Sequence, residues 1–424
     1  MAENDSEQKR EVSTTGSDKS GVGTPTKRAV AMIDEMKSPT RSLPLTGKNW
    51  AWPFFILVLA YIVGIAVGAM KSYTGGTTGA NVGFLVATFF LGSLLGVVIY
   101  NLGKGLGARI AGYRLAYLCI SGLCWDGSRA AHRFYFDGSQ FLEIHSRYVP
   151  VDDNVDRDPL LMHITGLVIW AVVFVVFIVV GMVAVKSADL ANVKWGMVYG
   201  AAFSGDYVIY QLCPFRQDYP SDIFALASTR KPEERRAYNI YYYNRGNEFA
   251  DVEMLVPDFE SYDSYWKART LIYVFRSHLY VSSEIEEALS TFTKLHQVSA
   301  YLNEEEKAQI AGERLFVLLL LKDRAGADSL FIELPKTIKG EVVRSETLSS
   351  FRTSLLVSGV IVGREDTAID NVKTMLKILP AEANSTKLKT ERRYYKLAYD
   401  SVKAVKPSFR LPELNFSAPA QGQE

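Results

Sequence analysis

The chain has 424 residues, a formal net charge of +1 and a hydrophobic content of 48%. Near-neutral charge argues against a dedicated nucleic-acid binder, which usually concentrates a basic excess on one face. The three cysteines are too few to suggest a disulfide framework, and small apolar packing is expected for all of them. The average composition hides a division, because residues 51–213 hold long apolar runs while 1–48 and 216–424 carry most of the charge.

Four apolar runs predict a membrane domain over residues 49–215. Residues 1–48 lack aromatic side chains and are predicted to be a disordered cytoplasmic leader. Residues 51–70 are almost unbroken in apolar character and, as a helix, match the thickness of the hydrocarbon core of a bilayer. Three further runs of similar character follow, at 82–100, 160–185 and 193–213.

Basic residues close to these runs predict the orientation in the membrane, because cytoplasmic loops carry an excess of Lys and Arg. The loops at 71–81 and 186–192 carry one Lys each. The opposite side collects three basic residues near each crossing: Lys37, Arg41 and Lys48, then Lys104, Arg109 and Arg114, then Arg216, Arg230 and Lys231. Both termini and segment 102–159 are therefore predicted to be cytoplasmic.

The cytoplasmic segments have different patterns. Segment 102–159 alternates aromatic and β-branched residues with Gly-containing turns, which predicts a small β-hairpin insertion. Residues 216–406 are predicted to form an all-α cytoplasmic domain. Its short turns resemble those of an α-solenoid, although no repeat consensus is visible. A flexible Pro-rich tail is expected at 407–424. The helices expected in this domain cover 233–244, 259–280, 284–300, 304–322, 346–361, 366–378 and 388–404.

The end of the second apolar run carries a motif. It reads Tyr100-Asn101-Leu102-Gly103-Lys104, followed by Ala108-Arg109 and Gly112. This segment resembles the active-site helix of site-2-protease-type intramembrane metallopeptidases, whose pattern is His-Glu-x-Gly-His, an Ala-Arg pair and a helix-ending Gly before the first strand. Gly103 and Gly112 stand at the two Gly positions of that pattern.

The resemblance implies that the catalytic residues have been lost. In the family, two His at i and i+4 hold zinc and the Glu between them acts as general base. Here Tyr100 and Lys104 stand at the His positions and Asn101 at the Glu position. Tyr is a poor zinc ligand at neutral pH, the Lys ammonium repels a cation, and Asn cannot accept a proton. The expected protein therefore has no metal, no cofactor and no peptidase activity.

A third zinc ligand of this family is an Asp that follows an Asn-x-x-Pro segment. The closest match here is Gln211-Leu212-Cys213-Pro214, followed by Asp222, which the resemblance makes the vestigial ligand position. The Gly that often follows this Asp is missing, and the distance in sequence from Pro214 is longer than in the commonest pattern. An alternative is that Pro214 simply ends the fourth run. If the resemblance holds, Tyr100 and Lys104 share a helix face close to the end of the fourth run.

Asp206 is a candidate intramembrane polar site. It interrupts the fourth run together with Ser204 and Gln211, and an ionisable group inside a membrane is costly. Lys104 and Tyr100 are its expected partners. A structural ion pair that holds the helices together is the simpler interpretation.

These features predict a catalytically inactive binding, regulatory or scaffold protein in the lipid bilayer. Its membrane domain is expected to hold a partner membrane protein or membrane segment, and its helical domain a soluble cytoplasmic protein, with no nucleic acid. A transporter or permease-associated subunit is the alternative, although inverted repeats are not apparent. A third possibility is an enzyme with unusual chemistry around Lys104 and Asp206.

Overall fold

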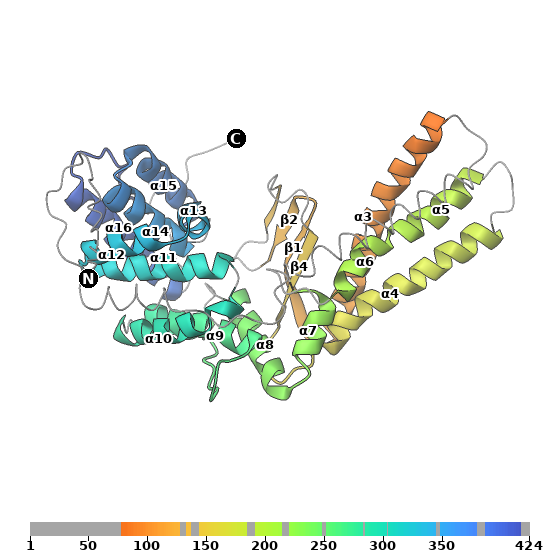
Figure 1. The fold of residues 1–424 in the computed structure, drawn as a ribbon, viewed down its shortest axis with the longest axis horizontal. Coiled ribbons are helices and arrows are strands. Elements are labelled where there is room, and N and C mark those ends of the chain that lie inside the picture. The colour runs from red at the N-terminus through yellow and green to blue at the C-terminus, as the bar shows by residue number, and fades with distance from the viewer. Residues whose placement is uncertain are drawn as a thin grey trace, which may run out of the picture.

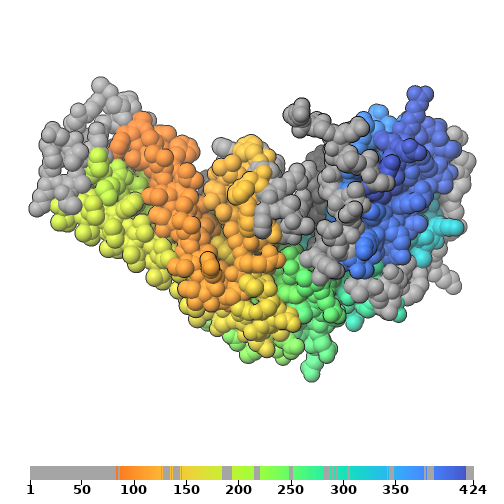
Figure 2. Space-filling model, turned by 180° about the vertical axis from the view of Figure 1, so that it is seen from behind, coloured from red at the N-terminus to blue at the C-terminus, as the bar shows by residue number. Residues whose placement is uncertain are grey.

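The computed structural model describes residues 78–127, 133–136, 144–184, 191–213, 220–247, 252–282, 285–302, 304–344, 348–379 and 386–416. The described residues form two arms (Figure 1): long helices before residue 213 make one arm, and helices after residue 265 make the other. A small sheet and two short helices lie between the arms. Figure 2 shows the same two arms from behind, with the green residues at their base. The predicted leader and the run at 51–70 lie outside the described residues.

Two helices are long and apolar enough to cross a membrane. Helix α3 (Thr78–Ile110) has 33 residues and contains the first candidate span, Val86–Ile110. Helix α4 (Leu160–Val179) continues through a π-helical turn, η2 (Val180–Ala184), and contains the second, Leu160–Val183. The two helices pack against each other. The second and third apolar runs therefore form helices of the predicted kind.

Four transmembrane helices are not supported by the structure. The fourth run forms two helices, α5 (Ala191–Phe203) and α6 (Gly205–Leu212), of 13 and 8 residues. Neither reaches the length of about 20 residues that a span needs. The division falls at Ser204, whose hydroxyl donates to the carbonyl of Ala201 at 2.6 Å. Bonds of this type, from a Ser hydroxyl back to the preceding turn, often bend helices.

Glycines on α3 allow its neighbours to approach closely. A Cβ added to Gly96 would lie 2.3 Å from the carbonyl oxygen of Ser204, and one added to Gly107 would lie 2.4 Å from that of Leu161. Each belongs to a Gly-x-x-x-Gly pair, whose other members are Gly92 and Gly103. Such pairs let helices approach backbone to backbone in membranes. One pair fixes α3 against α5 and α6, and the other fixes α3 against α4.

The segment between α3 and α4 forms an antiparallel sheet, as predicted. Its strands are β1 (Tyr113–Ile120), β2 (Leu123–Asp126), β3 (Arg133–Phe136) and β4 (Ile144–Pro150), in the order β3-β2-β1-β4. Gly112 has a φ of +77°, a left-handed conformation that Gly adopts without strain. It ends α3 and allows β1 to begin at once.

Cys119 and Cys124 are buried in a small apolar cluster, as expected, but they also form a disulfide, which was not expected. The turn at Ser121-Gly122 has positive φ angles of 51° and 80°. Two-residue turns of this type join strands in tight hairpins. This turn sets the register that places Cys119 opposite Cys124, where the disulfide forms. Cys213 is a free thiol.

Among the described residues, every element after the first arm is a helix. The two short helices at the base are α7 (Asp222–Ser228) and α8 (Pro232–Gly246). The second arm contains α9 (Tyr265–Ser277), η4 (His278–Ser282), α10 (Ile285–Gln297), η5 (Ser299–Tyr301), α11 (Glu304–Leu320), α12 (Arg324–Glu333), α13 (Lys336–Arg344), α14 (Leu348–Leu356), η6 (Val357–Val362), α15 (Glu365–Ile378) and α16 (Thr386–Val405). All seven expected helices are present, whereas α7, α12 and α13 were not expected. The solenoid organisation stays a prediction.

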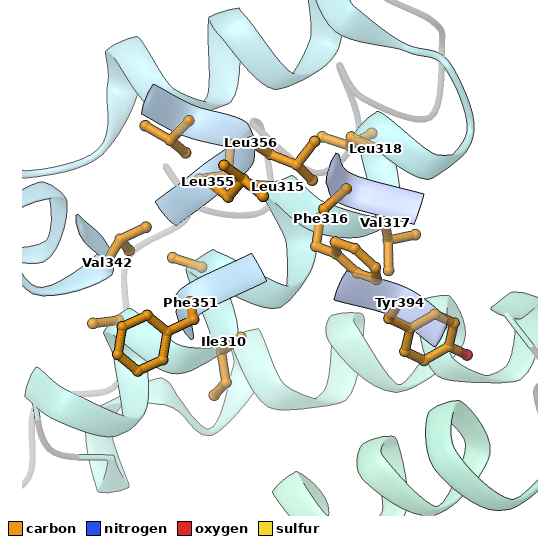
Figure 3. Packing of buried hydrophobic residues seen from close by; sticks show 14 of the residues in the cluster. Ile310, Leu315, Phe316, Val317, Leu318, Val342, Phe351, Leu355, Leu356 and Tyr394 are labelled. Carbon is orange, nitrogen blue, oxygen red and sulfur yellow. The ribbon is translucent and has the colours of Figure 1, made fainter. Parts of the chain in front are cut away.

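The second arm, called the helical arm below, has its own apolar core (Figure 3). In this core Phe316 of α11, Leu355 of α14 and Tyr394 of α16 lie together. Residues 407–416, expected to begin the flexible tail, pack on this core. The buried side chain of Leu411 belongs to it, and the hydroxyl of Tyr399 donates to the carbonyl of Pro412 at 2.8 Å.

Candidate functional site

The site is centred on Asp222, the first residue of α7. The side chain of Ser221 caps this helix by accepting a hydrogen bond from the amide of Phe224 at 3.3 Å. The amide of Asp222 donates to the side-chain oxygen of Gln211, at the end of α6, at 3.1 Å. These two interactions fix a carboxylate that is only 3% exposed.

Three side chains from the two candidate spans reach this carboxylate. The hydroxyl of Tyr100 donates to Oδ2 at 2.6 Å. The ammonium of Lys104 donates to Oδ1 at 2.6 Å, and Nδ1 of His163 lies 2.5 Å from the same oxygen. Tyr100 and Lys104 lie on α3 and His163 on α4, so the cluster ties both long helices to α7.

The structure brings together three of the positions that the motif singled out. Tyr100 and Lys104 are one turn apart, so they lie on one face of α3, and both contact Asp222. Asn101 is buried but points elsewhere, donating to the carbonyl of Val97 at 2.9 Å. Gly103 packs against α4, while Gly112 forms the turn into β1 and is not part of the cluster.

His163 was missed by the sequence analysis. It is buried, and the hydroxyl of Tyr238 on α8 lies 3.3 Å from its Nε2. The motif comparison considered only paired histidines, and His163 stands alone. The available signal was its place in the first turn of an otherwise apolar span, where an ionisable side chain needs a partner.

The predicted partners of Asp206 were wrong. Its Oδ2 accepts from the hydroxyl of Ser93 at 2.6 Å, and its Oδ1 accepts from the amide of Tyr207 at 2.6 Å. Ser93 lies about two turns before Tyr100 on α3, so Asp206 faces a different level of the helix from Lys104. The structure therefore contains two separate polar sites between α3 and the segment that follows α4.

Charge neutralisation dominates the electrostatics at Asp222. Burial alone would raise the pKa of this carboxyl, but Lys104 and His163 outweigh that effect, and its pKa lies well below the usual range of an Asp. The carboxylate therefore stays ionised at neutral pH and pairs with the Lys104 ammonium at 2.6 Å.

The side chains around Asp222 do not fit the zinc ion that active members of the resembled peptidase family bind. A catalytic zinc has about three protein ligands and an open position for water. Here the Lys104 ammonium lies against the carboxylate, and the Tyr100 hydroxyl uses its proton to bond the other oxygen. Within the described residues, no group of three His, Cys, Asp or Glu side chains could hold a metal ion.

A small pocket of about 40 Å³ adjoins the cluster. It is formed by α3, β4, α4, α7 and α8 together with Pro220, the residue before the cap of α7. Its lining consists of Lys104, Ser146, Arg147, Tyr148, Met162, His163, Pro220, Ala225, Tyr238, Tyr242 and Arg245. Two of the three side chains that bind Asp222, Lys104 and His163, thus also line a cavity next to it.

Comparisons of the chain with family models, curated proteins and solved structures found no match.

Proposed function

We propose that the protein is a catalytically inactive relative of site-2-protease-type intramembrane metallopeptidases that acts as a membrane-bound binding or regulatory scaffold. The observation that carries this proposal is the 2.6 Å contact between Lys104 and Asp222. The resemblance assigns these two residues, with Tyr100, to the positions of three zinc ligands. Asp222 is more than 110 positions away from Tyr100 and Lys104 in the sequence, and the three side chains meet at one point.

In this proposal the lysine charge takes over the structural role of the metal. A zinc ion would join α3 to α7 by binding ligands from both helices. Here the ammonium of Lys104 and the hydroxyl of Tyr100 make the same connection through Asp222, and His163 adds α4. Such a cluster fixes the relative positions of the helices, as a scaffold requires, and includes no general base beside a metal-bound water.

Zinc content tests the loss of the metal site. We expect far less than one zinc per purified full-length chain, because an ammonium occupies the position beside the single acidic ligand. The triple variant Tyr100→His, Asn101→Glu, Lys104→His should bind zinc, since it places two imidazoles one turn apart facing Asp222. The same triple variant carrying Asp222→Asn is the matched control and should bind more weakly. Stoichiometric zinc in the unmodified chain that is lost with Asp222→Asn would refute the proposal.

The proposal includes a multi-pass topology with both termini in the cytoplasm. It is supported by the two candidate spans and by the basic residues at the ends predicted to be cytoplasmic. It requires α5 and α6 together to return the chain to the side on which Lys104 meets Asp222. Reporter fusions at 71–77 and 186–190 should report the outside, and fusions at the N-terminus and after Cys213 should report the cytoplasm. An external location of the fusion after Cys213 would contradict the proposed topology.

The proposed partners follow from the two arms. The arm formed by the helices before residue 213 would hold a membrane protein or membrane segment. The arm formed by the helices after residue 265 would hold a soluble cytoplasmic protein. Site-specific photo-crosslinking from the exposed residues Leu91 on α3 and Ile332 on α12 would test each arm separately. Adducts with lipid alone from Leu91 and none from Ile332 would contradict this assignment.

A further inference from the structure

The pocket beside Asp222 has a strongly positive lining. Lys104 comes from α3, Arg147 from β4 and Arg245 from α8. No carboxylate is among the described residues that line it, although Asp222 bonds the Lys104 ammonium at 2.6 Å. The other polar side chains of the lining are those of Ser146, Tyr148, His163, Tyr238 and Tyr242.

The two arginines approach this pocket from opposite elements. The guanidinium of Arg147 lies over the ring of Tyr117, 5.5 Å from its centroid. The guanidinium of Arg245 donates to the hydroxyl of Tyr241 at 2.7 Å. That hydroxyl also donates to Glu306, so Arg245 is held at a fixed distance from the helical arm.

The pKa of Tyr242 reflects the positive charges around the pocket. Burial raises the pKa of this tyrosine, and Arg245, Arg269 and Arg147 each oppose that increase. Arg269 is paired with Glu306 at 3.0 Å and does not line the pocket. Arg245 and Arg147 therefore both act on one hydroxyl in the lining, from two different elements.

The pocket also lies at one end of both candidate spans. Lys104 is near the end of Val86–Ile110, and His163 is near the start of Leu160–Val183. The phosphates of a bilayer lie just beyond the hydrocarbon core, at the ends of the helices that cross it. Basic pockets between helices at this level are typical sites for anionic headgroups.

We propose that this pocket binds a phosphate group, supplied by an anionic phospholipid headgroup or by a soluble phosphate ester. The guanidinium groups match phosphate geometry through paired N–H donors, and Lys104 adds a point charge. A cavity volume of about 40 Å³ accommodates roughly three water-sized groups, which suits the three terminal oxygens of a phosphate monoester. If the phosphate belongs to a nucleotide, its nucleoside part would have to lie outside the pocket, because the cavity is too small to hold it. This inference does not depend on the proposed relation to peptidases.

Binding is measured with the full-length chain in neutral detergent, and inorganic phosphate is the first probe. Phosphate should raise the melting temperature in a saturable way, because a ligand that binds only the folded state stabilises it. The second probe is a phosphatidylcholine nanodisc with or without phosphatidic acid, read by native mass spectrometry. Retained phosphatidic acid identifies the lipid as the source. A response to phosphate and to glycerol phosphate without retained lipid identifies a soluble ester.

Arg147→Gln is the decisive variant. We expect at least about a tenfold loss of affinity for phosphate, since a charged hydrogen-bonding group is removed. Arg147→Lys should lose less, because it retains the charge but not the planar fork. Arg109→Gln, an exposed arginine on the same end of α3, is the matched control and should bind as the unmodified chain does.

The result that overturns the proposal is equally defined. Absence of any response to phosphate, glycerol phosphate and phosphatidic acid would refute it. Equal loss of binding in Arg147→Gln and Arg109→Gln would also refute it, since it would show a general charge effect. The melting temperature of Arg147→Gln without phosphate shows whether the variant is folded. If it is not, the Arg147→Lys comparison decides.

Discussion

Asp222→Asn should destabilise the protein by about 3–5 kcal/mol, the range found when one partner of a buried ion pair is removed. The variant removes the negative charge but leaves the buried ammonium of Lys104, which is then uncompensated. Thermal unfolding of the purified chain in detergent measures the effect as a lower melting temperature. The exposed residue Asp158, which pairs with Arg235 at 3.1 Å, provides the control, because Asp158→Asn should cost at most about 1 kcal/mol.

A double variant separates the charge effect from loss of packing. Lys104→Met combined with Asp222→Asn removes both charges, so its melting temperature should be higher than that of Asp222→Asn alone. The unmodified chain should also be sensitive to acid. Because the pKa of Asp222 is lowered on folding, its contribution is present above the ordinary Asp pKa and is lost as pH falls below about 4. If Asp222→Asn melts as Asp158→Asn does, the cluster is not the link between α3 and α7.

Arg352→Met should have a comparable effect in the helical arm. Arg352 on α14 is fully buried, and its guanidinium bonds Glu313 at 2.8 Å and Glu391 at 2.7 Å. It also lies over the ring of Phe316, 3.9 Å from the centroid. Removing it leaves two buried carboxylates that repel each other, and the expected loss of stability is about 3–5 kcal/mol or more.

The pH dependence distinguishes this effect from a simple cavity. Burial raises the pKa of Glu391, and Arg352 opposes that rise. In Arg352→Met the pKa should therefore rise further. A raised folded-state pKa gives stability that is present below the unfolded pKa and lost as pH rises through the folded one. The melting temperature of the variant should thus be closer to that of the unmodified chain at pH 5 than at pH 8. A difference independent of pH would contradict this, and Arg364→Met, at an exposed arginine, is the control.

Much of the fold could be predicted because its signals are local. Runs of apolar residues longer than a helical core segment predicted α3 and α4, and Gly-containing turns predicted the sheet. The approach of Tyr100 and Lys104 to the same partner follows from their spacing of four residues on a helix. The identity of that partner, Asp222, came only from the family resemblance, since it lies more than 110 residues away in sequence.

Other features depend on contacts that the sequence does not display. Asp323 caps helix α12, and its carboxylate accepts a hydrogen bond from the amide of Gly326 at 2.9 Å. Gly326 itself has a low helix propensity, so the sequence does not indicate this helix. His163 is a site residue only because α4 packs beside α3. Asp206 bonds Ser93 because these two residues lie at the same position along the packed helices α3 and α6. The order of residues in the sequence does not show which residues of the two helices lie side by side.

The length of α3 has a mechanical consequence. Its 33 residues span about 50 Å, whereas the hydrocarbon core is about 30 Å thick. If α3 crosses a bilayer, about 10 Å of the helix stands outside the hydrocarbon even at a tilt of about 40°, the upper end of the usual range. Only Ala111 and Gly112 separate this rigid rod from β1. In a thinner or thicker bilayer the tilt angle of the helix would change, and the sheet attached to its end would rotate with it.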